Sequence, residues 1–186
     1  MGVSWFQPTA VVSLDLFDRL AIPLDAPVID IGGGTSPLVD GLLARGFSDL
    51  TVLDISVRAL ETVRERLGTG PSVALIHADL LEWKSERRYG VWHDRAVFHF
   101  LVDEQDRARY LRLLRSALSP GGFVILATFA SDGPEYCSGL PVARYDASDL
   151  TRLLGTDFDT LEERREEHVT PAGALQTFTW LAAKYR

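Results

Sequence analysis

Short apolar runs alternate with longer amphipathic segments from Val28 onward, and this rhythm constrains the fold more than any other feature of the chain. The apolar runs cover residues 28–31, 50–55, 72–77, 91–97 and 123–129. Each is followed by a segment whose apolar side chains recur at helical spacing, as Leu60, Val63 and Leu67 do. Strands that alternate with helices in this way predict βαβ crossovers and a parallel sheet covered on both faces.

The two ends of the chain depart from this alternation. An amphipathic segment over residues 8–20 predicts a helix, and we take residues 1–26 as an N-terminal helical cap. Residues 119–122, which read Ser-Pro-Gly-Gly, are expected to end the helix that precedes them. Residues 131–145 read as a long irregular loop, and a short helix over 147–154 precedes a hairpin formed by 158–168 and 175–185. We expect one domain over residues 1–186.

Composition excludes several classes of partner. The net charge of −7 argues against a nucleic-acid partner, and no run is long and apolar enough for a membrane span. Cys137 is the only cysteine, so the chain can form no internal disulfide and has no metal-binding cysteine pair. We therefore expect a protein of the reducing cytoplasm, without a metal and without an export signal. The oligomeric state is left open.

A glycine-rich turn follows the first predicted strand, in the sequence Val-Ile-Asp-Ile-Gly-Gly-Gly-Thr-Ser at residues 28–36. Glycines such as Gly32 and Gly34 let a ligand approach the backbone closely, and a helix N-terminus offers free N–H groups beside them. A dinucleotide fingerprint requires a further glycine three residues after Gly34, where this chain has Pro37. The turn therefore favours a ligand site but weakens an NAD-binding interpretation.

Acidic residues stand at or near the ends of four predicted strands: Asp30, Asp54, Asp79 and Asp94. The carboxyl ends of parallel strands meet at one edge of a sheet, so these four side chains are predicted to converge on one crevice. Clustered carboxylates repel a pyrophosphate. S-adenosylmethionine (SAM) has a sulfonium and an ammonium group and no phosphate, so it suits such a site better than NAD does.

Taken in order, these motifs resemble those of the class I SAM-dependent methyltransferases. Residues 30–34 resemble the family's D-x-G-x-G turn, and 119–122 resemble its L-x-P-G-G turn before the fifth strand. The resemblance implies an α/β, Rossmann-like fold whose mostly parallel, seven-stranded sheet has an antiparallel last strand. It implies SAM as the cofactor. The cofactor-binding residues that it implies are Asp30, Gly32 and Gly34 for the methionine part, Asp54 for the ribose, Ile55, Asp79 and Leu80 for the adenine, and Asp94 for the methionine ammonium.

A narrower resemblance is to protein-lysine methyltransferases typified by citrate synthase lysine methyltransferase. Their glycine-rich turn reads D-x-G-x-G-x-S-x-L, as residues 30–38 do here. Their fourth strand closes with D-K-G-x-x-D-x-L, where residues 94–101 have Arg95 in place of Lys, Ala96 in place of Gly and His99 in place of Asp. The resemblance implies that Arg95 and His99 bind the substrate, and the departures fall at that point of the motif.

His99 is the predicted catalytic residue. It follows the fourth strand near the expected mouth of the crevice, and an ordinary histidine pKa suits proton removal near neutral pH. Three functions remain open: a protein-lysine methyltransferase, an N- or O-methyltransferase acting on a small metabolite, and a non-catalytic SAM-binding module. The acceptor is thus either a protein or a small molecule. Trp5, Phe6 and Gln7 are either a lid over the site or an anchor for the first helix.

Overall fold

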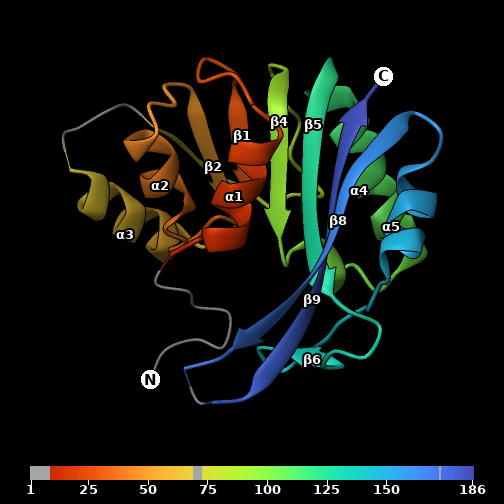
Figure 1. Cartoon of the computed structure of the whole chain (residues 1–186). Helices are drawn as coiled ribbons and strands as arrows, with labels where there is room; N and C mark the ends of the chain where they lie inside the picture. Colours follow the sequence, from red (N-terminus) through yellow and green to blue (C-terminus); the bar gives the residue numbers. More distant parts are fainter. Residues whose placement is uncertain (1–8, 69–72, 172) are drawn as a thin grey trace.

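A seven-stranded sheet forms the centre of the molecule (Figure 1). The computed structural model describes residues 9–68, 73–171 and 173–186. The strands of the sheet are β1 (Val28–Ile31), β2 (Leu50–Asp54), β3 (Ala74–His77), β4 (Tyr89–Arg95), β5 (Leu118–Phe129), β8 (Phe158–Val169) and β9 (Leu175–Tyr185). Their order is β3-β2-β1-β4-β5-β9-β8; the first five are parallel, and β9 is antiparallel to both of its neighbours. The predicted fold class is confirmed.

Helices cover both faces of the sheet (Figure 1). On one face lie α1 (Val11–Arg19), α2 (Leu38–Ala44) and α3 (Val57–Leu67), whose apolar side chains pack on the alternate residues of the strands that point toward them. On the other face lie α4 (Glu104–Ala117) and α5 (Ala147–Leu154). The central strands are therefore buried on both sides, as near-continuous apolar runs predict.

Local sequence signals set where the helices begin. The hydroxyl of Ser56 accepts a hydrogen bond from Ala59 N at the start of α3, and the carboxylate of Asp103 accepts one from Gln105 N at the start of α4. At α5, Asp146 and Asp149 form a reciprocal capping box. These caps satisfy backbone donors that the first turn of a helix leaves without partners.

Four details differ from the sequence expectations. No helix follows β3, because residues 78–88 connect it to β4 through turns and bends. Residues 119–122 are not a turn that stands apart from β5 but an irregular part of this strand, where the pairing with β4 shifts register. Strand β4 ends at Arg95, and a 3₁₀ turn, η1 (Phe98–Phe100), follows. The loop over 131–145 contains a two-stranded sheet of β6 (Tyr136–Cys137) and β7 (Leu140–Pro141), which buries Cys137. Trp5, Phe6, Gln7, Pro8 and Ser72 lie outside the described residues.

The β8–β9 hairpin extends past the end of β5 toward β6 (Figure 1). Strand β8 is the edge of the sheet, and over residues 161–167 its side chains alternate between exposed and half-buried. Charges there pair across elements, as Arg19 does with Glu162 at 3.1 Å. The interpretation of residues 162–167 as a solvated strand edge agrees with this pattern, and charged edges discourage pairing with another chain.

Candidate functional site

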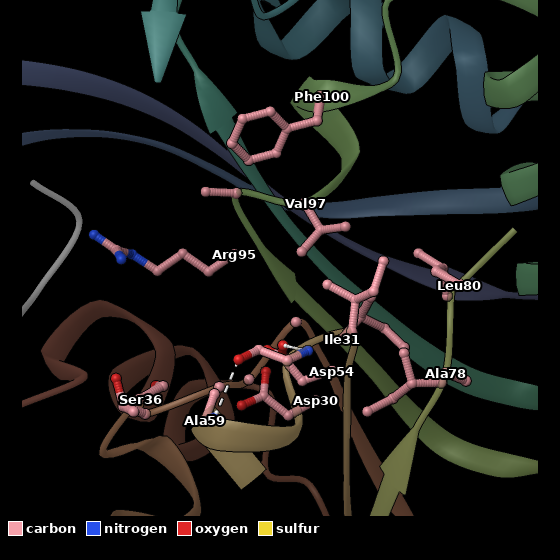
Figure 2. A pocket seen from close by; sticks show the side chains of 18 of the residues that line it. Asp30, Ile31, Ser36, Asp54, Ala59, Ala78, Leu80, Arg95, Val97 and Phe100 are labelled. Atoms are coloured by element: carbon pink, nitrogen blue, oxygen red, sulfur yellow. Dashed lines mark hydrogen bonds between the residues drawn. The ribbon is translucent and has the colours of Figure 1, made fainter. Parts of the chain in front are cut away.

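A cavity of about 660 Å³ opens at the carboxyl ends of β1 to β4 (Figure 2). Its volume lies within the range of small-molecule sites, and its position is the one at which open parallel sheets bind ligands. Three of the four predicted strand-end acids line it, namely Asp30, Asp54 and Asp79. The whole glycine-rich turn, residues 32–34, lines it as well.

The glycine-rich turn has no space for side chains. Gly32 has φ +62°, and a Cβ there would collide with the side chain of Val97. Gly34 has φ +42°, and its Cβ would lie 3.0 Å from Asp54 Oδ2. A Cβ on Gly33 would lie 2.5 Å from Asp30 Oδ2, so the middle glycine, which the motif does not specify, is also required. Only glycine fits these positions, and the bare backbone is left facing the cavity.

Asp54 and Ile55 lie next to each other at the end of β2. Asp54 Oδ1 accepts a hydrogen bond from Ser56 N at 2.7 Å, which fixes the carboxylate at the cavity wall. Burial raises the pKa of Asp54 from its ordinary value. The side chain of Ile55 is 67% exposed although it lines the cavity, so it offers an uncovered apolar surface to a ligand.

Asp79 and Leu80 lie beyond the end of β3, and both line the cavity. Asp79 Oδ1 accepts a hydrogen bond from Leu81 N at 2.9 Å, whereas Leu80 is buried in the core on the α4 side of the sheet. Figure 2 shows Ala78 and Leu80 across the cavity from Arg95. The structure thus brings every predicted cofactor residue except Asp94 to one cavity.

Asp30 is held by a buried chain of hydrogen bonds that the sequence did not predict. His93 stands opposite Asp30 in the register of β1 and β4, and its Nδ1 lies 2.7 Å from Asp30 Oδ1. Its Nε2 lies 2.9 Å from the hydroxyl of Ser13 on α1. From its place beside Asp94 in the sequence, His93 could have oriented that residue, but alternation along β4 directs the two side chains to opposite faces.

Asp94 lies outside the cavity, contrary to the sequence expectation. Its side chain is fully buried on the α4 face, where Oδ1 accepts hydrogen bonds from Val97 N at 2.8 Å and Phe98 N at 3.3 Å. Oδ2 accepts a hydrogen bond from the hydroxyl of Tyr110 at 2.7 Å. Burial raises the pKa of Asp94 to about 6. This carboxylate holds the turn after β4, and it is not among the residues that line the cavity.

His99 is also not among the cavity residues. Its ring is fully buried between Phe100 and Phe129, with centroid separations of 4.5 and 4.8 Å. Burial, with a smaller contribution from the charge of Arg95, lowers the pKa of His99 to about 3. Because the ring is enclosed and does not line the cavity, it does not reach a substrate bound there. The structure therefore gives no support to His99 as the base or as a substrate contact.

Arg95 does line the cavity, as expected for a substrate-binding residue. Its guanidinium carbon lies 4.8 Å from the centre of the Phe178 ring on β9. Burial lowers the pKa of Arg95, and the nearby carboxylates of Glu166 and Asp30 oppose this change. Phe100 on η1 and Cys137 on β6 also line the cavity, and neither follows from the strand-end pattern because both elements lie in the connections that come after β4 and β5.

Comparison with known proteins places the chain in a family. The model of a methyltransferase domain matches residues 28–122, which run from the first residue of β1 into β5 and include every predicted cofactor residue. The chain belongs to the methyltransferase domain family. It is therefore a class I SAM-dependent methyltransferase domain, as the order of its motifs predicted.

Two curated relatives are malonyl-[acyl-carrier protein] O-methyltransferases. Malonyl-[acyl-carrier protein] O-methyltransferase 1 of Ilyobacter polytropus is 30% identical over 136 residues, which are 70% of this methyltransferase domain and 50% of that protein. A second malonyl-[acyl-carrier protein] O-methyltransferase of the same organism is 23% identical over 137 residues. The chain spans about half the length of these curated relatives.

Solved structures share the fold. The 1,6-didemethyltoxoflavin-N1-methyltransferase of Burkholderia thailandensis, with S-adenosylhomocysteine (SAH) bound, has a TM-score of 0.75 and 21% identity, and the match covers 95% of this chain and 77% of that one. NodS of Bradyrhizobium japonicum, in complex with SAH, also has a TM-score of 0.75, at 15% identity, and the match covers 96% of this chain and 88% of that one.

Two features are absent from the described residues. No group of histidine, cysteine, aspartate and glutamate side chains there is placed to hold a metal ion. No helix in that part of the chain is both long enough and apolar enough to cross a membrane.

Proposed function

We propose that this chain binds SAM in the cavity at the strand ends and transfers its methyl group to a small-molecule acceptor. The observation that carries this proposal is the joint placement of Asp30, Asp54 and Asp79 around a turn that only glycine can form. These three carboxylates outnumber the two arginines, Arg58 and Arg95, that also line the cavity, so the lining favours a ligand that carries positive charge and no phosphate. The domain family, whose model spans these same residues, supports the same conclusion.

The cavity residues fit SAM part by part. The glycine-rich turn and Asp30 would hold the methionine part, Asp54 would accept hydrogen bonds from the ribose hydroxyls, and the exposed side chain of Ile55 would pack on the adenine. Asp79 and Leu80 would bind the adenine edge. SAM supplies a methyl group on a sulfonium, which is already a good leaving group. The protein's contribution is therefore to exclude water and to align the acceptor.

Between the two classes of acceptor expected from the sequence, the cavity favours a small molecule over a protein lysine. Arg95 is a buried cation on the side of the cavity that the proposed cofactor residues do not use, and it opposes the entry of an ammonium group. The names of two similar proteins give malonyl-[acyl-carrier protein], a small acyl group held on a carrier, and 1,6-didemethyltoxoflavin, a small molecule, as acceptors. The similarity to protein-lysine methyltransferases rests on the turn at 30–38 and on Asp94 and Leu101, and residues 94–101 depart from that motif at Arg95, Ala96 and His99.

Calorimetry with SAM, SAH and NAD tests the proposal. We expect SAM and SAH to bind and to raise the melting temperature, and NAD to do neither. Asp54→Asn should weaken SAM binding about 10- to 100-fold because a hydrogen bond to a charged group contributes about 1.5–3 kcal/mol. The exposed Glu61 on α3 provides a matched control, Glu61→Gln, that should bind SAM like the wild type.

Two outcomes would contradict the proposal. Wild-type protein that binds NAD but not SAM would overturn the choice of cofactor. Protein that binds SAM but transfers no labelled methyl group to any compound in a bacterial metabolite extract would be a non-catalytic SAM-binding module.

A further inference from the structure

The turn that follows β4 forms part of the cavity wall. Residues 95–97 all line the cavity. Val97 lies directly against the glycine-rich turn, because a Cβ on Gly32 would collide with the Val97 side chain. In the view of Figure 2, the side chain of Val97 lies between those of Phe100 and Ile31, which also line the cavity. The position of Val97 therefore sets how much room a ligand has beside the bare backbone of Gly32.

This turn depends on its surroundings for its shape. Ala96 adopts φ +73°, a left-handed conformation that is unfavourable for a residue with a Cβ. A residue stays in such a conformation only where neighbouring groups hold it there. Ala96 N donates a hydrogen bond to Ala127 O on β5 at 2.9 Å, which joins the turn to the sheet at one point. The chain beyond this bond, which includes Val97, needs a further contact to fix it.

Asp94 supplies that contact from the opposite face of the sheet. Its side chain is fully buried, and Oδ1 accepts hydrogen bonds from Val97 N at 2.8 Å and from Phe98 N at 3.3 Å. Hydrogen bonds to an ionised acceptor are stronger than those between neutral groups. Because both bonds close within residues 94–98, they fix the peptide units on either side of Val97 relative to the end of β4.

The carboxylate is itself anchored to helix α4. Oδ2 accepts a hydrogen bond from the hydroxyl of Tyr110 at 2.7 Å, and that hydroxyl accepts one from the indole of Trp92 at 2.9 Å. The ring of Phe98 packs against that of Tyr110, with centroids 4.8 Å apart. The turn is thus anchored to α4 on one side and touches the glycine-rich turn on the other. A buried network outside the cavity is therefore connected to the cavity wall.

We propose that Asp94 is a positioning residue for the cofactor: its Oδ1 holds Val97 against the glycine-rich turn, and the affinity for SAM depends on that contact. This inference rests on the proposed function, since the cofactor is the one proposed for the cavity. Asp94 acts on SAM without touching it, through the backbone of one turn. This role differs from the direct ammonium contact that the sequence led us to expect.

Displacement of Val97 in either direction weakens the binding. If Val97 moves toward the cavity, its methyl groups take the space that a ligand needs beside Gly32. If it moves away, the ligand loses an apolar wall and the van der Waals contacts with it. Either change acts at the end of the cavity where the proposed methionine site lies.

Variants of Asp94 separate the hydrogen-bond acceptor from the mere presence of a buried side chain. Asp94→Leu fills a similar volume but accepts no hydrogen bond, and its Kd for SAM in calorimetry should rise at least about tenfold. Asp94→Asn keeps an oxygen for the two N–H groups and should stay within about threefold of the wild type. Wild-type affinity in Asp94→Leu would overturn the proposal. An equal loss in both variants would do the same, because the acceptor would then not matter.

A control variant distinguishes positioning from a general loss of stability. Leu154 on α5 is buried in the same apolar cluster as Phe98 and Tyr110, but it does not line the cavity. Leu154→Ala should lower the free energy of unfolding and leave the Kd for SAM unchanged, measured well below the melting temperature of each variant. A loss of SAM affinity in Leu154→Ala as large as that in Asp94→Leu would assign the effect to stability and refute the positioning role.

A double-mutant cycle with Val97 measures a coupling that a purely structural role does not produce. Val97→Ala should itself weaken SAM binding, and in that background Asp94→Leu should cost at least about threefold less affinity than in the wild type. Equal losses in the two backgrounds would refute action through Val97. If Asp94→Leu does not fold, Val97→Ala decides alone, and an unchanged Kd for SAM overturns the inference.

The wild type separates the two proposals. Wild-type protein that does not bind SAM refutes the proposed function, and this inference falls with it. Wild-type protein that binds SAM, with variants of Asp94 and Val97 that bind it equally well, refutes only the positioning role.

Discussion

Asp94 provides a quantitative test of the structure because a fully buried carboxylate makes stability depend on pH. Its pKa is raised from 3.8 to about 6, and burial is the main cause. The folded state therefore binds the proton more tightly than the unfolded state does. The stabilisation from this group is fully present below pH 3.8 and is lost as the pH rises through 6. The gap between the two pKa values corresponds to about 3 kcal/mol, at about 1.4 kcal/mol for each pKa unit.

Asp94→Asn removes this titration while keeping an oxygen for Val97 N and Phe98 N. We expect the variant to gain on the wild type by about 2–3 kcal/mol in free energy of unfolding between pH 4 and pH 7. Urea unfolding at half-unit pH steps, followed by tryptophan fluorescence, measures this difference directly, because other titrating groups are common to both proteins and cancel.

A second variant checks the cause. The hydroxyl of Tyr110 donates to Asp94 and lowers the pKa of that carboxyl, so Tyr110→Phe should move the pH-dependent loss of stability to higher pH. Parallel stability profiles for the wild type and Asp94→Asn would mean that Asp94 titrates in the folded protein as it does when unfolded. The reasoning from burial would then be wrong.

Three further predictions concern the cavity and its surroundings. Gly32→Ala should abolish detectable SAM binding because the new Cβ meets Val97. Gly68→Ala is its control, since Gly68 also has φ +62° but no described atom lies within 4 Å of the added carbon. Equal loss of binding in both variants would point to backbone strain alone. His99→Leu should keep the rate of methyl transfer within about twofold and leave the pH-rate profile unchanged, since the ring lies outside the cavity with a pKa of about 3. A variant that is tenfold slower but normally stable would restore a catalytic role. His93→Phe should weaken SAM binding and lower the melting temperature because it leaves Asp30 and Ser13 without their shared partner. Each buried group left without a partner costs about 1–3 kcal/mol of stability. Unchanged SAM affinity in calorimetry would show that Asp30 does not act on the cofactor.

The strands and most of the helices were predictable because strands buried on both faces of a parallel sheet are near-continuous apolar runs, which alternate with amphipathic helices. The helix at Ala147–Leu154 and the final hairpin were predicted to within a residue, because Gly155 and the turn after Val169 interrupt clear patterns. The boundaries of β4 and β5 were less accurate. Val97 is apolar like a strand residue, yet Ala96 adopts φ +73° and takes the chain out of the sheet. Nothing in the local sequence indicates that conformation.

The candidate site was predictable where side-chain direction follows from the strand end and not where it depends on alternation along a strand. Asp30, Asp54 and Asp79 come from neighbouring strand ends and line one cavity. Asp94 also closes a strand, but its neighbour His93 occupies the cavity face, so Asp94 points to the other side of the sheet. A shift of one residue in β4 reverses this assignment, and a single sequence does not fix that register.

The hydrogen bonds from Ser13 through His93 to Asp30 have a thermodynamic consequence. Ser13 on helix α1 and Asp30 on β1 each hold one ring nitrogen of His93 on β4. A ligand that orders Asp30 therefore makes detachment of α1 from the sheet less favourable. Because such coupling is reciprocal, the packed helix raises the affinity for that ligand by the same factor by which the ligand lowers the equilibrium constant for detachment. Amide hydrogen exchange along α1 should therefore slow when the cavity is filled, although no residue of α1 lines the cavity.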